Sequence, residues 1–485
     1  MNILIRDVNW LGDAVMSLPA IRGIRKLHQN AKIYLLVRKK LAQLFKIENS
    51  IDEIIIYEDG LKGKIKAIKK LRKIKLQRAY LLQNAIDAGI LAYLAGIPER
   101  VGWDRDCRRF FLTHPIPYKG EDKKIHHIDY FFTIPKRFNP SLHPEYPWLM
   151  VSLNDRLLAR EELKQLKRPI LAVAPGATYG DTKKWDAHKF AEIIRMFTEK
   201  YGSVIILGQK KEGLSLNIKD NENNVYDLTG KTSLFDLIKI LSECDLLLCN
   251  DSGIMHLGYA LGAPLVAIFG STSPKLTGPP RFAGKVIKAE ISCSPCFKKR
   301  CPDIKCMKLI DVEEVWNALL ELLPTKKAIF FDRDGTLCKD ANYLNKWEDF
   351  EIFPHIETLR ELKELGFMLI GVTNQSGIAR NIVDEDFVKQ VNQIFITKYC
   401  FDDFLYCPHH PMDNCFCRKP NPAMALIARY KYKIDFKNSY VVGDKDSDMQ
   451  LAQMIGAKGI LMDRDAKNLK DVVELIKKEV NAKRN

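Results

Sequence analysis

The stretch Ala-Ile-Phe-Phe-Asp-Arg-Asp-Gly-Thr, residues 328–336, places an apolar run directly before two carboxylates. Four apolar residues bounded by a polar turn predict a buried strand over Ala328–Phe331, followed by a loop that carries Asp332 and Asp334. In open parallel sheets, ligands bind beyond the carboxyl ends of the strands. A carboxylate there can attack a phosphate ester while a second one transfers protons. Alone the pattern is weak, because turns favour Asp and Gly for conformational reasons.

Three later motifs place polar residues where further strands of such a sheet would end. They are Thr373-Asn374 after the apolar run Phe367–Val372, then Arg418–Pro420, and last Gly443–Asp446 after the run Tyr440–Val442. Because the carboxyl ends of parallel strands meet at one edge, these residues are expected to converge. Taken in this order, the four motifs resemble the haloacid dehalogenase superfamily over essentially all of residues 327–465.

This resemblance implies a magnesium-dependent phosphatase in which Asp332 is the nucleophile and forms a phospho-aspartate intermediate. It makes Asp334 the general acid and base, and it implies that Asp332, Asp334 and Asp444 hold Mg²⁺. The residues expected to bind the phosphoryl group and the rest of the substrate are Thr373, Asn374, Arg380, Arg418, Lys419 and Lys445. A lysine offers phosphate a point charge and a threonine offers a hydroxyl, which suits these roles. Asp446 and Asp448 are expected to be solvated or to support the site from outside it.

Three thiols and an imidazole lie within eleven residues just before the Arg-Lys-Pro motif. These residues are Cys407, His409, Cys415 and Cys417. Together they are the ligand set of a closed tetrahedral zinc site. The alternative is that they are scattered buried cysteines without a metal. The pattern resembles the heptose-bisphosphate phosphatases, which release the 7-phosphate of D-glycero-D-manno-heptose 1,7-bisphosphate. That resemblance favours His409 over His410 as the ligand.

Two further stretches extend the likeness to that family, Asp340–Tyr343 and Asn374–Arg380. One position departs from it. The family usually has Gly after Arg380, whereas this chain has Asn381, a residue that tolerates a left-handed backbone. Histidinol-phosphate phosphatase, a close relative, remains the alternative for the substrate.

The first 320 residues repeat a strand, turn and helix pattern in two series. An extended apolar run at Asn2–Arg6 precedes a turn broken at Gly12 and a helical pattern over Ala14–Leu27. The second series begins with a buried strand at Ile170–Ala174 and a helix over Asp186–Lys200. The whole predicts an α/β fold with two doubly wound Rossmann-like domains followed by a Rossmannoid haloacid dehalogenase-like domain, at residues 1–165, 166–325 and 326–485.

Asp13 lies at the expected start of the first helix, inside the opening Asn9–Pro19. The ordinary explanation is an N-cap, because aspartate accepts bonds from free backbone N–H groups. Two small-residue loops that precede later helices, Gly176–Trp185 and Asn250–His256, favour another explanation, since helix starts of this kind attract phosphates. One domain would then supply a base and the other would hold a diphosphate, an arrangement that resembles a GT-B glycosyltransferase.

More closely, the opening stretch, Ala95–Trp103 and Asn250–His256 resemble the ADP-heptose:lipopolysaccharide heptosyltransferases of glycosyltransferase family 9, over roughly residues 1–320. Trp10 makes the opening nearer the second heptosyltransferase than the first. The resemblance implies ADP-heptose as donor, the lipopolysaccharide inner core as acceptor, Asp13 as base and no metal cofactor for the transfer. The ADP part would be bound by Thr178, Lys183, Asp251 and Ser252.

Two departures accompany this likeness. Asp186 stands where Pro often follows the tryptophan. Lys184 adjoins Lys183, so the spacing does not decide which lysine meets the diphosphate. A lysine there can stabilise the charge of the leaving group, which other glycosyltransferases stabilise with Mg²⁺.

The chain is basic, with 76 Lys and Arg against 60 Asp and Glu, a net charge of +16. Such a charge favours phosphorylated substrates, an anionic membrane face or nucleic acid. No recognised nucleic-acid motif is present, so no nucleic-acid partner is expected. The densest basic block, Lys62–Arg78, predicts a basic amphipathic helix with one core-facing stripe formed by Ile65, Ile68, Leu71 and Ile74.

No apolar run approaches the ~18 residues needed to cross a bilayer, and the chain opens without a signal-peptide pattern. A cytoplasmic protein is therefore expected, with peripheral contact to the anionic face of the inner membrane left open. In that reducing compartment the 12 cysteines are thiols or metal ligands. A second group of cysteines consists of Cys293, Cys296, Cys301 and Cys306. We expect these to be structural thiols, and a zinc site is the alternative.

The two halves of the chain predict one bifunctional enzyme of lipopolysaccharide core biosynthesis. A heptose-bisphosphate phosphatase makes an intermediate on the route to ADP-heptose, and a heptosyltransferase consumes that donor. The alternatives are the same folds acting on another nucleotide sugar and another phosphate ester, such as histidinol phosphate, or a basic nucleic-acid-binding protein.

Overall fold

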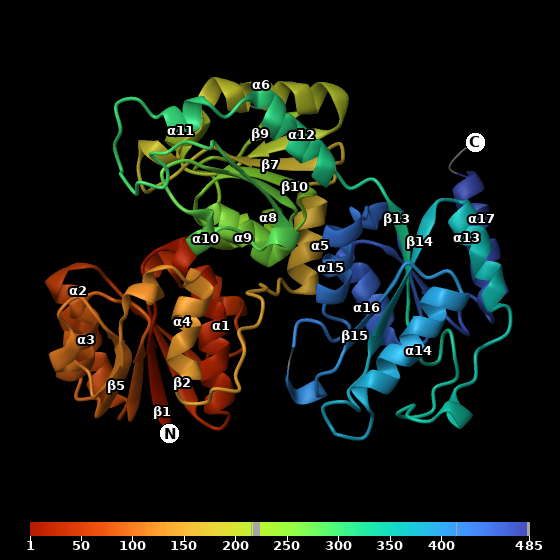
Figure 1. Ribbon diagram of the computed structural model, residues 1–485, viewed down its shortest axis with the longest axis horizontal. Coiled ribbons are helices and arrows are strands. Elements are labelled where there is room, and N and C mark those ends of the chain that lie inside the picture. Colours follow the sequence, from red (N-terminus) through yellow and green to blue (C-terminus); the bar gives the residue numbers. More distant parts are fainter. Residues whose placement is uncertain (215, 217–223, 414, 483–485) are drawn as a thin grey trace. The chain divides into compact units, whose positions relative to one another are not determined.

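The chain folds into two compact units, Met1–Glu321 and Leu322–Asn485. The computed structural model describes residues 1–214, 216, 224–413 and 415–482 (Figure 1). The first unit contains two six-stranded sheets and the second contains one five-stranded sheet, all built from parallel strands. The predicted α/β fold class is confirmed. The further division of the first unit near residue 165 stays a prediction.

The first sheet has the strand order β3-β2-β1-β4-β5-β6. Its central strand is fully buried at Ile3, Leu4 and Ile5. Leu4 faces a cluster formed with α2 and α3, whereas α1 and α4 pack against each other. The elements are β1 (Asn2–Arg6), α1 (Leu11–Leu27), β2 (Lys32–Arg38), β3 (Glu53–Tyr57), α2 (Gly60–Lys73), β4 (Arg78–Leu81), α3 (Ile86–Leu94), β5 (Glu99–Asp104), β6 (His114–Pro117) and α4 (His127–Lys136).

Helix α1 begins earlier than the sequence predicts. The expected break at Gly12 is wrong, because Gly12 is the second residue of the helix and Trp10 holds the N-cap position. A Cβ on Gly12 would lie 2.6 Å from Cδ2 of His256 on the second sheet's helix α9. The glycine therefore permits close packing of two helices rather than a turn.

The second sheet has the order β12-β11-β10-β7-β8-β9. The strand predicted at Ile170–Ala174 is observed with those bounds. All five of its residues are apolar because a strand inside a parallel sheet is buried on both faces. The elements are α5 (Leu153–Glu162), β7 (Ile170–Ala174), α6 (Ala187–Lys200), β8 (Ser203–Ile206), α7 (Lys210–Leu214), β9 (Val225–Asp227), α8 (Leu234–Leu241), β10 (Leu246–Asn250), α9 (Gly253–Leu261), β11 (Leu265–Phe269), α10 (Pro274–Thr277), β12 (Gly284–Lys288), α11 (Lys305–Lys308) and α12 (Val312–Leu322).

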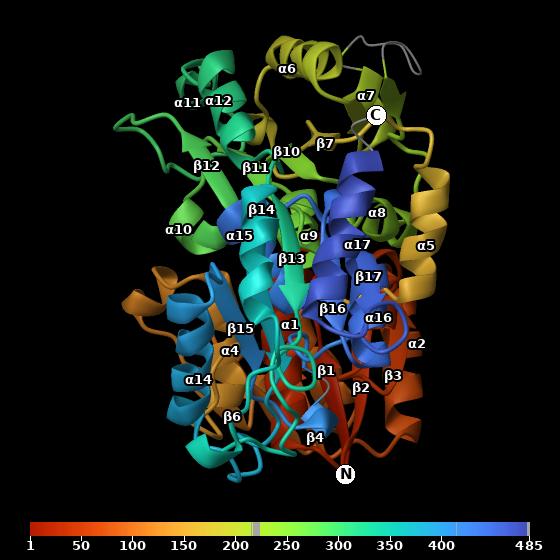
Figure 2. The same cartoon turned by 90° about the vertical axis from the view of Figure 1, so that its right-hand side faces the viewer.

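The second unit's sheet has the order β15-β14-β13-β16-β17, and Figure 2 shows β13 among its neighbours. Ile329 and Phe331 of β13 face a core that includes Phe395 of α14 and Val472 of α17. The elements are β13 (Lys327–Phe331), α13 (Arg360–Glu364), β14 (Phe367–Asn374), α14 (Glu385–Lys398), β15 (Asp403–Cys407), α15 (Ala423–Tyr432), β16 (Tyr440–Gly443), α16 (Asp446–Ile455), β17 (Lys458–Leu461) and α17 (Leu469–Ala482).

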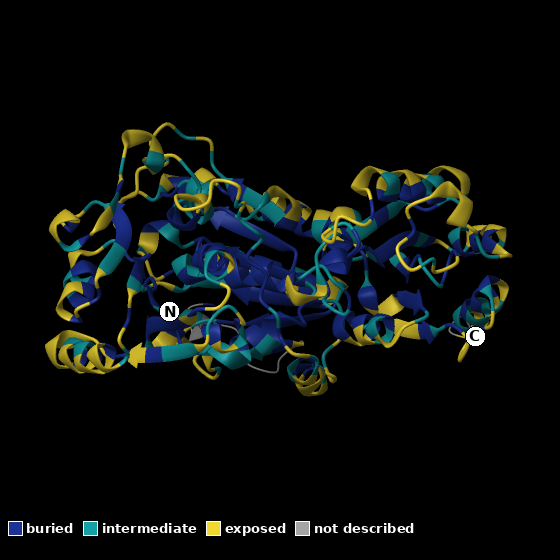
Figure 3. Cartoon of the chain, turned by 90° about the horizontal axis from the view of Figure 1, so that it is seen from below, coloured by how far each residue is buried: buried dark blue, intermediate teal, exposed yellow. Residues whose placement is uncertain are grey.

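Burial follows the layers of each unit. The strands are almost entirely buried, and the helices are exposed along their outer sides (Figure 3). Among the described residues, none of the helices combines the length and the apolar character needed to span a membrane.

Candidate active sites

Three carboxylates meet at the carboxyl end of the second unit's sheet. Asp332 follows β13, Asp444 follows β16, and Asp448 lies on the first turn of α16. One oxygen from each lies within 4.8 Å of the others. Gly335 adopts a left-handed φ of +89°, and a Cβ there would lie 2.3 Å from Oδ2 of Asp444, so the turn requires glycine.

Lys419 joins two of these carboxylates. Its Nζ lies 2.8 Å from Asp332 and 2.7 Å from Asp448, and its side chain is 1% exposed. Burial alone would lower the pKa of Lys419, but attraction to the two carboxylates outweighs it and the pKa is raised. Burial raises the pKa of Asp332 to about 6 despite the lysine. Lys419 therefore stays charged beside the predicted nucleophile.

Asp448 is more closely involved than the sequence indicated. It is fully buried, so of its two expected roles the solvated one is wrong. Asp446, two residues before it, is exposed. The alternation arises because α16 turns one side toward the sheet, a consequence that the motif itself did not reveal.

Asp334 lies beside the carboxylate cluster with different partners. It pairs with Arg333, whose Nε is 3.0 Å away, and it accepts a hydrogen bond of 2.6 Å from Nε2 of Gln375. Thr373 is buried and bonded to the same amide at 2.8 Å. The close carboxylate group thus contains Asp448, and Asp334 is not a member of it.

The other predicted substrate-binding residues make contacts of several kinds. Asn374 exchanges hydrogen bonds with the backbone of Lys419, at 2.9 Å and 3.2 Å, and so fixes the lysine's position. Nη1 of Arg418 is buried without a hydrogen-bond partner among the described residues. Exposed Arg380 lies over the Tyr343 ring, 5.8 Å from its centroid. Lys445 pairs with Asp340 at 3.0 Å.

Asn381 adopts a φ of +55°, the left-handed conformation that its Asn side chain was expected to tolerate. The departure from the usual glycine is therefore compatible with the backbone at this position.

The four predicted zinc ligands converge. Nδ1 of His409 lies 3.1 Å from Sγ of Cys417 and 3.5 Å from Sγ of Cys407, and Cys415 lies 3.4 Å from Cys407. Tetrahedral Zn–S bonds of about 2.3 Å place ligand atoms roughly 3.7 Å apart, so these separations fit one ion. His410 instead accepts a bond from the amide of Met412 in a local turn.

The second cysteine group behaves differently. Cys293 and Cys296 are exposed, whereas Cys306 is buried. Among the described residues, the two groups of potential ligands within 4.8 Å are those around Asp332 and Cys407. The four cysteines at 293–306 therefore do not form a compact ligand group.

Two of the predicted nucleotide-binding residues, Lys183 and Asp251, are in direct contact. Nζ of Lys183 lies 2.5 Å from Oδ2 of Asp251, which also accepts a 2.6 Å bond from Thr272. Lys184 turns away and pairs with Asp181 at 2.9 Å. The structure thus separates the two lysines that the spacing left ambiguous.

Hydrogen bonds of Asn250 join the end of β10 to the loop that follows β7. Asn250 donates to the carbonyl of Pro175 at 2.6 Å and accepts from the amide of Trp185 at 3.1 Å. Ser252 is the N-cap of α9, and its buried Oγ has no hydrogen-bond partner among the described residues. Thr178 is exposed on the same loop. The loop and the start of α9 therefore offer free hydrogen-bonding groups side by side.

Asp186, the departure from the usual proline, caps α6. Its Oδ1 accepts a 2.8 Å bond from the amide of His188. Aspartate suits this position because its side chain satisfies a free N–H at the helix start.

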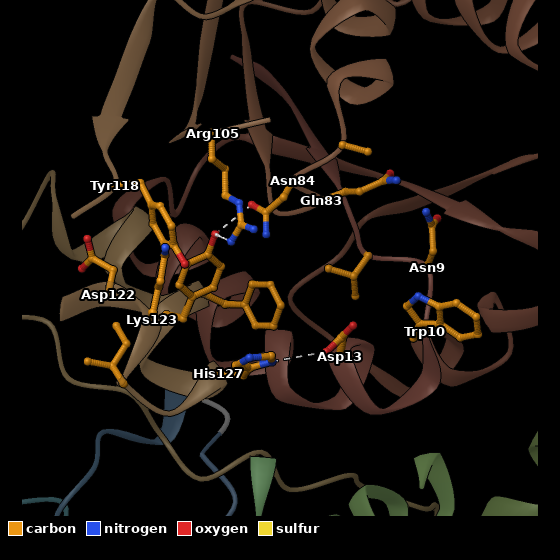
Figure 4. Close-up of a pocket in the computed structure, with 15 residues that line it drawn as sticks. Asn9, Trp10, Asp13, Gln83, Asn84, Arg105, Tyr118, Asp122, Lys123 and His127 are labelled. Carbon is orange, nitrogen blue, oxygen red and sulfur yellow. Dashed lines mark hydrogen bonds and ion pairs between the residues drawn. The ribbon is translucent and has the colours of Figure 1, made fainter. Parts of the chain in front are cut away.

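Asp13 lines a cavity of about 410 Å³ in the first sheet's half of the unit (Figure 4). It is the third residue of α1, and Trp10 rather than Asp13 is the N-cap. Nδ1 of His127 lies 3.6 Å from its Oδ1. The carboxylate is therefore directed into the cavity and does not cap the helix.

Cations and aromatic rings form the opposite wall of this cavity. Arg105 lies over the Tyr118 ring, 4.6 Å from its centroid, and contacts Tyr130 Oη at 3.4 Å. Figure 4 shows Arg105, Lys123 and His127 pointing toward the same space as Asp13. The cavity is thus lined by two carboxylates, Asp13 and Asp122, and by several groups that attract anions.

Comparisons with known proteins found relatives for both parts of the chain. A family model described as glycosyltransferase family 9 (heptosyltransferase) matches residues 65–307, and one described as HAD-hydrolase-like matches residues 416–481. Lipooligosaccharide heptosyltransferase 2 of Campylobacter jejuni is 30% identical over 334 residues, which are 67% of this chain and 98% of that protein. The chain belongs to glycosyltransferase family 9.

The second unit of this family 9 protein resembles a different enzyme. D-glycero-beta-D-manno-heptose-1,7-bisphosphate 7-phosphatase of Photorhabdus laumondii is 41% identical over 146 residues, 27% of this chain and 78% of that protein. The chain is therefore a fusion of a glycosyltransferase with a haloacid dehalogenase-like phosphatase, as predicted. A solved Escherichia coli ADP-heptose heptosyltransferase II shares the fold, with a TM-score of 0.58 at 23% identity over 66% of this chain and 98% of its own.

Sequence reasoning missed the cavity wall of the transferase. Arg105 follows β5, Lys123 lies in the loop after β6, and His127 begins α4. Each is an ordinary surface-type residue in the sequence, and no spacing links the three. They converge only because parallel strands bring their following loops to one edge of the sheet.

Proposed function

We propose that this chain transfers heptose from ADP-heptose to the lipopolysaccharide inner core, in the manner of heptosyltransferase II. We further propose that it hydrolyses the 7-phosphate of D-glycero-D-manno-heptose 1,7-bisphosphate. The observation that carries both proposals is that one chain resembles a heptosyltransferase and a heptose-bisphosphate phosphatase over separate parts. The transferase would consume ADP-heptose, and the phosphatase would make an intermediate on the route to that donor. The two activities would therefore serve the same pathway.

The phosphatase begins with attack of the Asp332 carboxylate on phosphorus. The P–O bond to the sugar breaks, and Asp334 gives its proton to the departing oxygen. Water then attacks the phospho-aspartate, Asp334 takes a proton from it, and the P–O bond to Asp332 breaks to release phosphate. Lys419, held 2.8 Å from Asp332, and the hydroxyl of Thr373 would stabilise the phosphoryl oxygens.

The carboxylate cluster fits Mg²⁺. Oδ1 of Asp444 is buried without a hydrogen-bond partner among the described residues, and an oxygen-rich group of this kind suits that ion. Asp332 and Asp444 would hold it, with Asp448 beside them. When bound, Mg²⁺ offsets the repulsion between the carboxylate nucleophile and the anionic ester. Asp334, bonded to Arg333 and Gln375, is left for proton transfer.

Zinc would have a structural role. Four protein ligands leave no open position for water, so the ion would shape the loop and not activate a nucleophile. The last ligand, Cys417, directly precedes Arg418 and Lys419. A closed zinc site would therefore fix the backbone that presents both cations to the substrate.

The transferase would use Asp13 as its base. Asp13 takes the proton of the acceptor hydroxyl, the oxygen attacks the anomeric carbon of the heptose, and the bond from that carbon to the ADP oxygen breaks. Lys183 and the start of α9 would stabilise the negative charge that develops on the departing diphosphate. Thr178, Asp251 and Ser252 would bind the rest of the ADP. No metal cofactor is proposed for this step.

The acceptor would enter the cavity beside Asp13. His127 lies near enough to orient the carboxylate, and Arg105 and Lys123 provide positive charge for an anionic inner-core sugar. We place the enzyme in the cytoplasm with peripheral contact to the inner membrane, and no nucleic-acid partner is proposed.

The test is a panel assay of the purified full chain. ADP-heptose with a heptose-bearing, Kdo-containing acceptor should give transfer, and heptose 1,7-bisphosphate should be hydrolysed in preference to histidinol phosphate. Turnover of other nucleotide sugars and phosphate esters in place of these would overturn the substrates while leaving the two folds unchanged.

A further inference from the structure

Helix α2 carries a dense positive charge and contains no acidic residue of its own. Between Gly60 and Lys73 it contains seven cations and no Asp or Glu: Lys62, Lys64, Lys66, Lys69, Lys70, Arg72 and Lys73. Its buried residues are Gly63, Ala67 and Leu71. Of the predicted core-facing stripe, Leu71 is buried in the core, and Ile68 and Ile74 pack against it, as expected. Only Ile65 departs from the prediction, because Gly63 and Ala67 take the buried positions beside Leu71.

The consequence is that large apolar side chains of α2 face solvent. Leu61 is 75% exposed and Ile65 is 44% exposed. Neighbouring α3 continues the surface with Tyr93 at 53% and Leu94 at 43%. A fifth residue, Phe110, in the short 3-10 helix that packs against α3, is 89% exposed. Exposed apolar groups gathered in this way usually mark a binding surface.

Direct contacts hold these elements together as one face. Lys64 pairs with Asp87 of α3 at 3.1 Å, and Nε of Arg72 donates to the carbonyl of Leu94 at 2.9 Å. Figure 1 shows α2 and α3 side by side at the outer left of the first sheet, and the same end is broadly exposed in Figure 3. The apolar residues and the lysines therefore belong to a continuous surface, here called the α2–α3 face.

We propose that the α2–α3 face docks on an anionic lipid bilayer. Lysines held near such a membrane are attracted to its negative headgroups. Leucine, isoleucine and aromatic side chains beside them can enter the boundary between headgroups and acyl chains. Nucleic acid or an acidic protein would account for the cations and not for the exposed Leu61 and Phe110.

The chain links this face to the Asp13 cavity. Gln83, Asn84 and Ala85 line the cavity, and α3 begins at the next residue, Ile86. A surface that rests on the bilayer would thus hold the cavity near molecules anchored there. The inference rests on the proposed peripheral contact with the inner membrane and names the face that makes it, and it does not depend on which sugar is transferred.

The experiment measures binding of the full chain to phosphatidylcholine vesicles made with and without phosphatidylglycerol. Two variants test the face: Lys66→Gln/Lys69→Gln/Lys70→Gln for charge and Leu61→Ser/Ile65→Ser for insertion. The matched control, Lys467→Gln/Lys470→Gln/Lys478→Gln, removes three exposed lysines from the other unit. All variants change exposed side chains, and circular dichroism checks their folding.

Wild type and the control should bind the phosphatidylglycerol vesicles alike. The α2 charge variant should bind on the order of 100-fold more weakly, since each lysine near an anionic surface contributes about 1 kcal/mol. The Leu61/Ile65 variant should also bind more weakly. Equal loss in the control, or unchanged binding by either α2 variant, would overturn the proposal. No sugar substrate is present, so this outcome is separate from the transferase assignment.

Discussion

Asp13 illustrates how one carboxylate can be assigned two roles by sequence and only one by geometry. An aspartate at a helix start is ordinarily a cap. Here the capping position belongs to Trp10, and Asp13 is the third residue of the helix, directed at the cavity and at His127. Its side chain makes no capping bond, so its presence needs another explanation.

We expect Asp13→Asn to lower heptosyl transfer by a factor of roughly 10²–10⁴, the usual range for losing a general base. The amide is nearly isosteric but cannot take a proton at neutral pH. The melting temperature should not change, because no cap is lost. The measurement is turnover beside the melting temperature, with ADP-heptose and a heptose-bearing acceptor.

A matched variant separates the base from its neighbour. His127→Gln removes the side chain beside Asp13 and leaves the carboxylate, so it should reduce turnover less than Asp13→Asn does. Near-normal turnover of the Asn variant with an unchanged melting temperature would remove the mechanistic basis of the transferase assignment.

His256 provides a pH-dependent contribution to stability. Burial lowers its pKa from 6.5 to about 3, an effect modified by nearby Asp13, His126, Lys183 and His127. The unfolded chain takes up a proton near pH 6.5, whereas the folded chain does not until about pH 3. Unfolding is therefore increasingly favoured as the pH falls below 6.5.

We expect His256→Gln to weaken this pH dependence. Melting temperatures of wild type and variant should converge as the pH is lowered from neutral toward 4, because the variant has no imidazole to protonate on unfolding. Other titrating groups affect both proteins equally and cancel in the difference. If the melting temperatures of wild type and variant fall in parallel as the pH is lowered, His256 is not the group responsible for the pH dependence.

At the scale of elements, sequence predicted strands better than side-chain positions. The strand Ile170–Ala174 was correct because a long apolar run bounded by polar residues has few other structures available. The start of α1 was not, since the reason for Gly12 is His256, more than 240 positions along the chain. Periodicity reports local structure and carries no information about such a partner.

The sites show the same division. The order of the motifs was enough to predict that Asp332, Lys419 and Asp444 lie at one edge of the sheet, because the carboxyl ends of parallel strands meet there. The burial of Asp448 and the positions of Arg105 and His127 depend on how a helix or loop is rotated. Rotation is set by tertiary packing, which no short motif encodes.

The loop from Cys407 to Cys417 is an element whose shape we expect to depend on metal. One zinc should be bound per chain, and Cys415→Ser/Cys417→Ser should lose it, because two of four ligands are removed. Phosphatase activity should fall in that variant, since Arg418 and Lys419 follow the last ligand. Elemental analysis and phosphate release are the measurements.

Cys400→Ser is the control for this prediction, because Cys400 lies in the same unit and outside the ligand group. It should retain both zinc and activity. Zinc retained undiminished in the double variant, or absent from unchelated wild type, would contradict the assigned ligands. Transferase activity should be unaffected throughout.

At the scale of the whole molecule, the residues proposed for the two activities lie in separate structural units. Asp13 and Lys183 belong to the unit Met1–Glu321, whereas Asp332 and Lys419 belong to Leu322–Asn485. Each unit has its own parallel sheets and its own buried core. A substitution that alters only the charge of one side chain should therefore affect one reaction.

We expect Asp332→Asn to abolish phosphate release and leave glycosyl transfer nearly intact. An amide cannot attack phosphorus, and the loss of one negative charge beside Lys419 leaves the lysine paired with Asp448. Paired assays on one preparation, with heptose bisphosphate and with ADP-heptose, measure both reactions. Normal phosphatase turnover in this variant would show that the assigned nucleophile is wrong.

Asp13→Asn supplies the reciprocal arm of the same experiment, because it should reduce transfer and leave phosphate release unchanged. If each variant affects only its own reaction, the double variant should show the two losses without interaction, as expected for sites that share no partners. A fall in transfer caused by Asp332→Asn would require coupling between the units. Titrating ADP-heptose against that variant would then show whether the coupling acts on donor binding, seen as a raised KM, or on the transfer step, seen as a lowered kcat.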